Sequence, residues 1–261
     1  MDTQGEMELE GGNLSKVVRV GETVRRTSGP WTPMVQRLLA HVRDRGFRLG
    51  PIPLGIDEQE REVLSYINGE TLTTHPWPHW VWSDSLLTQA VDALVAYHRA
   101  VVDFRPAVVE SRLGARQLLA DEIVCHNDFA PYNSVFDEGN LIGIIDWDIV
   151  CPGRPSWDLA FFAWHWVPLH PEAPELAWRT VGECERRLRL VADAYGLETR
   201  TGFVEEIIER IDTSRVDIIE RAQAGDPAFA RLEREGHSSE MERTLAFVHS
   251  VENRLQSALE A

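Results

Sequence analysis

The pattern of apolar residues changes along this chain, and that change constrains the fold more than any other feature. Between residues 8 and 27, apolar and polar residues alternate, which is typical of strands joined by tight turns. Beyond Pro174, apolar residues recur instead at helical spacing, in segments near 174–195, 201–223 and 238–260. A small antiparallel sheet followed by a larger, mainly helical part is an α+β plan with two lobes.

The stretch between these two ends predicts further elements of both kinds. Apolar residues within 35–42 lie at helical spacing, and the stretches 51–56 and 62–67 resemble strands. Ser83 or Asp84 can cap another helix. These elements would complete a sheet with one helix early in the chain and would begin the helical part after it.

The charge is distributed unevenly between the two expected lobes, which we place at residues 1–68 and 69–261. The 261 residues include 26 basic and 42 acidic side chains, a net charge of −16. The N-lobe carries only −1 of this charge and the C-lobe carries −15. Because phosphate backbones are bound by basic faces, this composition argues against a general nucleic-acid binder.

Composition also bears on the cellular compartment. The longest uninterrupted apolar run, Leu159 to Trp164, has six residues, far short of the ~20 that span a membrane. Residues 1–10 are acidic and polar, so we expect no secretory signal and no membrane partner. Three cysteines are too few for a disulfide framework, which predicts a reduced, cytoplasmic protein.

The most informative stretch runs from His126 to Asn133 and reads H-N-D-F-A-P-Y-N. Asp146 follows thirteen residues after Asn133, within I-D-W-D. Phosphoryl transfer uses such a set: one carboxylate, here Asp128, orients the acceptor hydroxyl and accepts its proton. One amide oxygen and one more carboxylate hold Mg²⁺ against the nucleotide phosphates.

Together these motifs resemble those of the aminoglycoside phosphotransferase and choline kinase family, whose fold is protein-kinase-like. That family reads H-x-D-x-x-x-x-N, then I-D-W-[DE], then a Gly-Pro loop and D-L-A. The segment from Cys151 to Ala160, C-P-G-R-P-S-W-D-L-A, is similar to the last part. The resemblance covers most of residues 8–166 and implies ATP or GTP as co-substrate, with Mg²⁺.

The resemblance implies a role for each residue of this chain that matches the family motifs. Asp128 would be the catalytic base or hydroxyl-orienting group, and Asn133 and Asp146 would be the metal ligands. His126 would brace the catalytic loop, and Asp158 would hydrogen-bond to backbone near it.

The same resemblance places the nucleotide contacts in the N-lobe. Backbone amides of a Gly-rich hairpin would cover the phosphates, and the backbone of a hinge-like segment would receive the adenine or guanine. The residues are Gly11, Gly12, Asn13 and Ser15 in the hairpin and Ser65, Tyr66 and Ile67 in the hinge.

Two departures from the family pattern concern the phosphate clamp. The third strand of such kinases carries a lysine, but the only lysine here is Lys16, which opens the second strand. Aligning the third strand puts Arg26 in the phosphate role, with Arg25 as the fallback. The following helix offers no glutamate in its first turns, so either Gln36 substitutes as the partner or the pairing is absent.

The acidic C-lobe favours a cationic acceptor such as an aminoglycoside, although the charge can also serve solubility alone. We expect Asp148 to assist the metal or the substrate, and acids of a C-terminal helix to hold the amines: Glu205, Glu206, Glu209 and Asp212. Alternatives are a metabolite kinase for choline, an amino alcohol or a sugar, and a catalytically inactive binding or immunity protein with the same fold.

Overall fold

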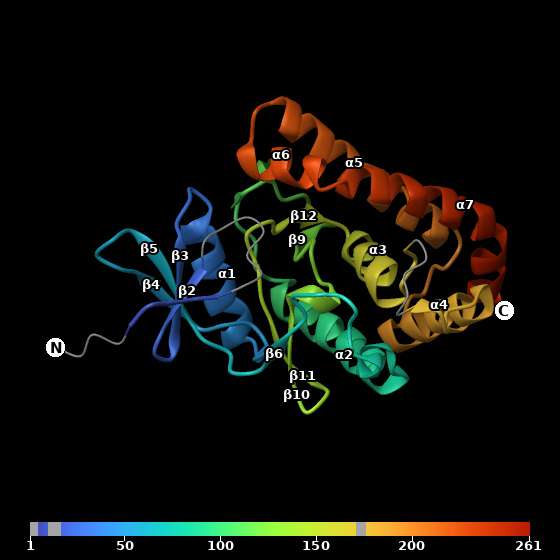
Figure 1. Cartoon of the computed structure of the whole chain (residues 1–261), viewed down its shortest axis with the longest axis horizontal. Helices are drawn as coiled ribbons and strands as arrows, with labels where there is room; N and C mark the ends of the chain where they lie inside the picture. Colours follow the sequence, from blue (N-terminus) through green and yellow to red (C-terminus); the bar gives the residue numbers. More distant parts are fainter. Residues whose placement is uncertain (1–4, 10–16, 171–175) are drawn as a thin grey trace. The chain divides into compact units, whose positions relative to one another are not determined.

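The computed structural model describes residues 5–9, 17–170 and 176–261, which form two compact units (Figure 1). The first unit comprises Met1–His75 and Ala93–Pro155, and the second comprises Pro76–Asp92 and Ser156–Ala261. All described strands lie in the first unit, and four of the described α-helices lie wholly in the second: α4, α5, α6 and α7. The predicted α+β class is confirmed. The lobe boundary between residues 68 and 69 stays a prediction.

The first unit is built on an antiparallel sheet of five strands in the order β1-β2-β3-β5-β4. The strands are β1 (Met7–Glu8), β2 (Val17–Val20), β3 (Thr23–Thr27), β4 (Pro53–Ile56) and β5 (Arg61–Ser65). The turn between β2 and β3 places Gly21 at φ 58°, in the left-handed region that favours glycine. The strands predicted at 51–56 and 62–67 are confirmed as β4 and β5.

Helix α1 (Thr32–Asp44) packs beside β4 and carries the apolar face predicted from residues 35–42. A proline near its start supplies a fixed φ where the helix needs no backbone donor. Val35 and Leu38 have no exposed surface, and Leu39 and Val42 have about 1%. This burial fixes α1 against the sheet, so the polar side chains on its flank have defined positions.

The rest of the first unit consists of short strands around the motif-bearing loops. Strands β6 (Glu70–Thr71), β10 (Ser134–Asp137) and β11 (Asn140–Ile144) form one small sheet, and β9 (Ile123–Cys125) pairs with β12 (Cys151–Gly153). A hairpin of β7 (Val108–Ser111) and β8 (Gly114–Gln117) completes the unit. The β9–β12 and β10–β11 pairs bring the two ends of the motif region together.

The second unit is helical. Its elements are η1 (His79–Trp82), α3 (Pro155–Trp166), α4 (Val181–Tyr195), α5 (Phe203–Gln223), α6 (Pro227–Arg234) and α7 (His237–Glu260), and α2 (Asp84–Val101) spans both units. Helices α5 and α7 run side by side, with α6 against α5 and α4 against α7 (Figure 1). No described helix combines the length and apolarity needed to cross a membrane.

Helices α3 and α6 were not predicted, for opposite reasons. Residues Asp158 to Trp166 of α3 are all buried, so this helix has no polar face and therefore no period to read. Helix α6 has only eight residues, too few for a periodic pattern, and is defined by its cap. There the Asp226 carboxylate accepts hydrogen bonds from the amides of Ala228 (2.9 Å) and Phe229 (3.4 Å).

Candidate active site

The predicted catalytic loop follows β9 in the first unit and is closed by its own hydrogen bonds. The amide of Ala130 donates to the carbonyl of Asp128 (2.9 Å), and that of Asn133 donates to the carbonyl of Ala130 (3.0 Å). Pro131 begins a single 3₁₀ turn, η2 (Pro131–Asn133). Asn127 has φ 64°, an uncommon value for a residue other than glycine that often marks a functional loop.

The Asp128 carboxylate accepts a hydrogen bond on each of its oxygens. Tyr132 Oη donates to Oδ1 at 2.7 Å, and Asn133 Nδ2 donates to Oδ2 at 2.7 Å. The Asn133 Nδ2 also donates to the Asp128 carbonyl at 3.0 Å. The loop thus fixes the position of the carboxylate through hydrogen bonds to both of its oxygens.

His126 lies beneath this loop, with no exposed surface. Its Nδ1 accepts a hydrogen bond from the amide of Asp128 (3.2 Å). Its ring packs on Trp147, with ring centroids 4.4 Å apart, and on Phe129, at 5.6 Å. This arrangement ties the backbone at Asp128 to the segment that follows Asp146, and it supports a bracing role for His126.

The two predicted metal ligands are brought together by the backbone. The amide of Ile145 donates to the carbonyl of Asn133 at 2.9 Å, so Asp146 comes one residue after that contact. Asn133 Nδ2 donates to Asp128, so Oδ1 of the same side-chain amide faces away from Asp128, where it could bind a metal. Amide and carboxylate oxygens suit Mg²⁺, which takes few protein ligands and completes its shell with phosphates and water.

Among the described residues, no group of three or more His, Cys, Asp or Glu side chains could hold a metal, so the predicted site would depend on Asn133 and Asp146 together with phosphates and water. The Asp146 side chain is 38% exposed, and protein atoms enclose the rest of it. This burial, followed by the charge of Asp148, raises the pKa of Asp146 to about 7, against the opposing effect of Arg26. A bound cation would favour the ionised form.

Arg26 is the central cation of the first unit. It is 7% exposed, and its guanidinium pairs with Glu62 through Nε and with Asp148 Oδ1 through Nη2 (2.7 Å). Its Nη1 lies 3.7 Å from Asp146 Oδ1. Burial disfavours the charged form, but Asp148, Glu62 and Asp146 together raise the pKa of Arg26 above its ordinary value.

Glu62 is the partner of Arg26 that the sequence reasoning missed. In the β3–β5 ladder it lies directly opposite Arg26, and it is 1% exposed. Gln36 Nε2 on α1 donates to Glu62 Oε1 at 2.7 Å. The acidic partner of the strand-three cation therefore comes from β5 and not from the helix, and Gln36 orients that partner without replacing it.

Arg25 occupies a different environment. Successive side chains of a strand point to opposite faces, and Arg25 Nε pairs with Asp57 Oδ2 at 3.3 Å. Between the two arginines, the contacts with Asp146 and Asp148 belong to Arg26. These contacts favour the Arg26 alignment over the Arg25 fallback. The phosphate role of Arg26 stays a prediction.

The structure describes only some of the residues predicted to contact the nucleotide. Gly11, Gly12, Asn13 and Ser15 lie outside the described residues. In the hinge, the amide of Ser65 donates to the Ile52 carbonyl and that of Tyr66 donates to the Glu22 carbonyl, both at 2.9 Å. Because those two amides already donate to other backbone groups, a nucleotide base would have to bind the carbonyl oxygens of the hinge or the backbone of Ile67. Recognition of a base by the hinge stays a prediction.

The remaining predicted residues differ in burial and partners. Asp148, 2% exposed, is held by Arg26, and its contact with metal or substrate stays a prediction. Asp158 lies in the second unit with no exposed surface, and its predicted bond to the loop also stays a prediction.

The four acids predicted to hold substrate amines all lie on α5: Glu205, Glu206, Glu209 and Asp212. Glu206 Oε1 accepts a hydrogen bond from Ser156 Oγ (2.9 Å). Asp212 Oδ1 pairs with Arg215 Nη2 (2.7 Å). Glu205 and Glu209 are exposed. The structure thus places two of the acids in pairs within the second unit and leaves two at its surface.

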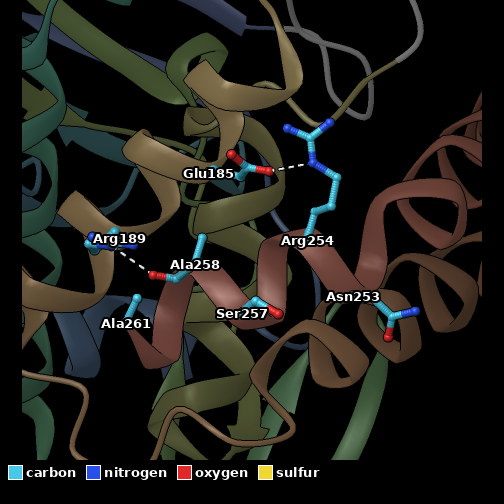
Figure 2. Close-up of a pocket in the computed structure, with 7 residues that line it drawn as sticks. All are labelled: Glu185, Arg189, Asn253, Arg254, Ser257, Ala258 and Ala261. Atoms are coloured by element: carbon cyan, nitrogen blue, oxygen red, sulfur yellow. Dashed lines mark hydrogen bonds and ion pairs between the residues drawn. The ribbon is translucent and has the colours of Figure 1, made fainter.

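A shallow, open hollow of about 480 Å³ lies between α4 and α7 in the second unit (Figure 2). The two arginines that line it already have partners. Arg254 Nε pairs with Glu185 Oε1 at 2.6 Å, and Arg189 Nε donates to the Ala258 carbonyl at 2.7 Å. None of the predicted site residues lines it. It therefore adds nothing to the candidate active site.

Comparisons with known proteins agree with this site. A model of the family described as "Phosphotransferase enzyme family" matches residues 104–191, which include both motifs. The trifolitoxin immunity protein of Rhizobium leguminosarum bv. trifolii is 33% identical over 209 residues, covering 77% of this chain and 78% of that protein. The chain belongs to the phosphotransferase enzyme family, which includes aminoglycoside phosphotransferases and choline kinases.

Solved structures show the same fold at low sequence identity. A choline/ethanolamine kinase family protein from Mesorhizobium loti has a TM-score of 0.54 at 18% identity, covering 94% of this chain and 92% of that one. The GDP complex of aminoglycoside 2'-phosphotransferase-IIIa has a TM-score of 0.59 at 14% identity, covering 93% of each chain. The predicted protein-kinase-like fold is therefore confirmed.

Proposed function

We propose that this chain is a Mg²⁺-dependent phosphotransferase that moves the γ-phosphate of ATP or GTP to a hydroxyl of a small, cationic molecule. Family membership supports small-molecule phosphotransferase activity in general. The observation that carries the specific proposal is the position of Arg26, which links Glu62 to Asp148 and Asp146 beside the Asp128 loop. A cation fixed among these carboxylates supports a phosphate-binding site that works together with a metal.

Each residue then has a task that follows from its contacts. Asp128, held by Asn133, accepts the proton of the acceptor hydroxyl while the oxygen of that hydroxyl bonds to the γ-phosphorus. The bond from the γ-phosphorus to the β–γ bridging oxygen breaks in the same step, and nucleoside diphosphate leaves. Asn133 and Asp146 would hold Mg²⁺, which when bound would neutralise charge on the phosphate oxygens. Arg26 neutralises the phosphates nearest to Asp146, and Glu62 keeps its guanidinium in place.

The acceptor is proposed to carry amines because the C-lobe holds nearly all the net negative charge. Glu205 and Glu209 are exposed on α5, where an amine could pair with them. The solved relatives support the class: one is named for aminoglycosides and another for choline or ethanolamine. All of these acceptors have an amine or quaternary ammonium group together with a hydroxyl.

A second candidate function is immunity by binding without turnover. It is favoured by the 33% identity to a protein named for immunity to trifolitoxin. Arg26 in place of the usual lysine is a chemical difference that fits such a protein. A guanidinium binds two oxygens at once, whereas a lysine ammonium is a single point charge, so the two groups would place a phosphate differently.

The experiment that separates the two is release of nucleoside diphosphate from MgATP and MgGTP, with a panel of aminoglycosides, choline, amino alcohols and neutral sugars. The proposed function predicts faster release with at least one amine-bearing acceptor, and loss of that acceleration in Asp128→Asn. Binding of an acceptor or toxin without release from any nucleotide would favour the immunity function instead.

A further inference from the structure

Tyr132 is a hydroxyl-bearing residue to which the sequence motifs assign no role. It lies in the 3₁₀ turn η2, between Pro131 and Asn133, and is half-buried. Its Oη is 2.7 Å from Asp128 Oδ1. A hydroxyl that donates to a carboxylate at this distance forms a strong, charge-assisted hydrogen bond.

The two oxygens of Asp128 are not equivalent in this site. Oδ2 accepts from Asn133 Nδ2, and Asn133 is fixed by its own bonds to the Asp128 carbonyl and to Ile145. The proposed metal role of Asn133 would hold it there during the reaction. Oδ1 is therefore the oxygen that meets an acceptor hydroxyl, and Oδ1 is where the Tyr132 hydroxyl lies.

We propose that Tyr132 stands in for the acceptor hydroxyl on Asp128 and keeps water away from this carboxylate until an acceptor displaces it. This inference rests on the proposed function. Tyr132 is then a positioning residue that protects bound nucleotide from hydrolysis. The residue is half-buried, so part of its surface faces solvent, toward which the ring would move when an acceptor binds.

The reaction that Tyr132 would suppress can be written in full. A water molecule at Oδ1 gives its proton to Asp128 as its oxygen bonds to the γ-phosphorus. The bond from that phosphorus to the β–γ bridging oxygen breaks, and the products are nucleoside diphosphate and inorganic phosphate. A tyrosine hydroxyl at Oδ1 occupies the place where this water would bind.

The test is the rate of nucleoside diphosphate release from MgATP and MgGTP with no acceptor present. Tyr132→Phe keeps the ring and removes the hydroxyl, so water can reach Oδ1. We expect the rate to rise at least about tenfold, a small part of the 10²–10⁴-fold range of general-base catalysis. The affinity for Mg-nucleotide, measured by titration calorimetry, should stay unchanged.

Two further variants make the result specific. In the double variant Asp128→Asn/Tyr132→Phe the gain should disappear, because the water would have no base. Tyr195→Phe, at the end of α4 in the second unit, removes a tyrosine hydroxyl elsewhere and should leave the rate at the wild-type value.

The outcomes separate the inference from the proposed function. If Tyr132→Phe binds Mg-nucleotide normally but releases diphosphate no faster than wild type, the inference is wrong and the proposed function stands. A gain that persists in the double variant would also overturn the inference. If the wild-type protein binds no Mg-nucleotide, the proposed function fails, and the inference fails with it.

Discussion

Several charged side chains are buried in the Asp128 region of the first unit, whereas the acidic side chains on helix α5 of the second unit are partly or fully exposed. Around Asp128, charges are buried and interlocked: Glu62, Asp148 and Arg26 are exposed by 1%, 2% and 7%. On α5, Asp212 pairs with Arg215 three residues along the same helix, and both are partly exposed. The first arrangement depends on strand register and burial, whereas the second is a local pair on a solvated helix.

This difference indicates where a substitution should cost the most stability. A buried ion pair that loses one partner leaves a charge without compensation, so the Arg26 network tolerates little substitution. A solvated pair on a helix contributes little to stability, so substitutions in such a pair on α5 should cost little. Under the proposed function, the first region would bind the nucleotide and the second would contact the acceptor. The predictions below test this division.

The largest expected effect is on stability, at Arg26. In Arg26→Ala the buried carboxylates of Glu62 and Asp148 lose their partner, and we expect the free energy of unfolding to fall by about 3–5 kcal/mol. Arg25→Ala is the matched control, since its pair with Asp57 is 18% exposed on both sides. The control should lose about 1 kcal/mol or less. Urea denaturation of both variants measures this, and equal losses would contradict the comparison.

The next effect is on turnover, at Asp128. Asp128→Asn removes proton acceptance and keeps the shape, so we expect turnover with an active acceptor to fall by about 10²-fold or more. Mg-nucleotide affinity should change little, because Asp128 is not a proposed metal ligand. Steady-state kinetics and calorimetry measure the two quantities. Unchanged turnover would show that Asp128 is not the base.

A third effect concerns pH and lies in the second unit. Burial, followed by the charge of His170, lowers the pKa of His165 well below its ordinary 6.5. Because the unfolded chain binds a proton that the folded one excludes, stability is present above pH 6.5 and is lost as pH falls towards the lowered pKa. The loss per pH unit can reach about 1.4 kcal/mol.

His165→Gln should flatten this dependence, while His237→Gln, at a 39% exposed histidine, should not. Chemical denaturation at several pH values between 7 and 5 makes the comparison. If His165→Gln and wild type lose stability in parallel, burial of His165 does not determine the acid sensitivity of this unit.

The smallest effect is expected on α5. Glu209→Gln and Asp212→Asn should each change the free energy of unfolding by no more than about 0.5 kcal/mol. They should weaken binding of a polycationic acceptor, and the weakening should fade as salt rises above ~0.1 M, where the screening length is about 10 Å. A salt series by calorimetry tests this. An effect equal at low and high salt would remove these acids from the acceptor site.

The parts of the site that the sequence could predict are those whose geometry is local. The catalytic loop places Asp128 and Asn133 within one short turn, so their spacing along the chain already implies their proximity. Tyr132 lies in that same turn, but no pattern distinguishes a tyrosine that bonds to Asp128 from one that packs in the core.

Glu62 could not be predicted for a different reason. Its meeting with Arg26 depends on the register between β3 and β5, and one sequence does not state a register. The expected helix partner directed attention to Gln36 instead. The available signal was a charged residue directly before two apolar residues, Val63 and Leu64, in this strand. Helix α3 escaped prediction because burial on all sides removes the period that identifies a helix.

The central claim is that the Asp128 region binds nucleotide through a metal. It is tested most directly by calorimetric titration of MgATP and MgGTP into the wild-type protein and Asp146→Ala, each with Mg²⁺ and with EDTA. The account predicts binding of at least one nucleotide to the wild type with Mg²⁺, and loss of that binding in EDTA and in Asp146→Ala. Equal affinity under all four conditions, or no binding of either nucleotide, would contradict it.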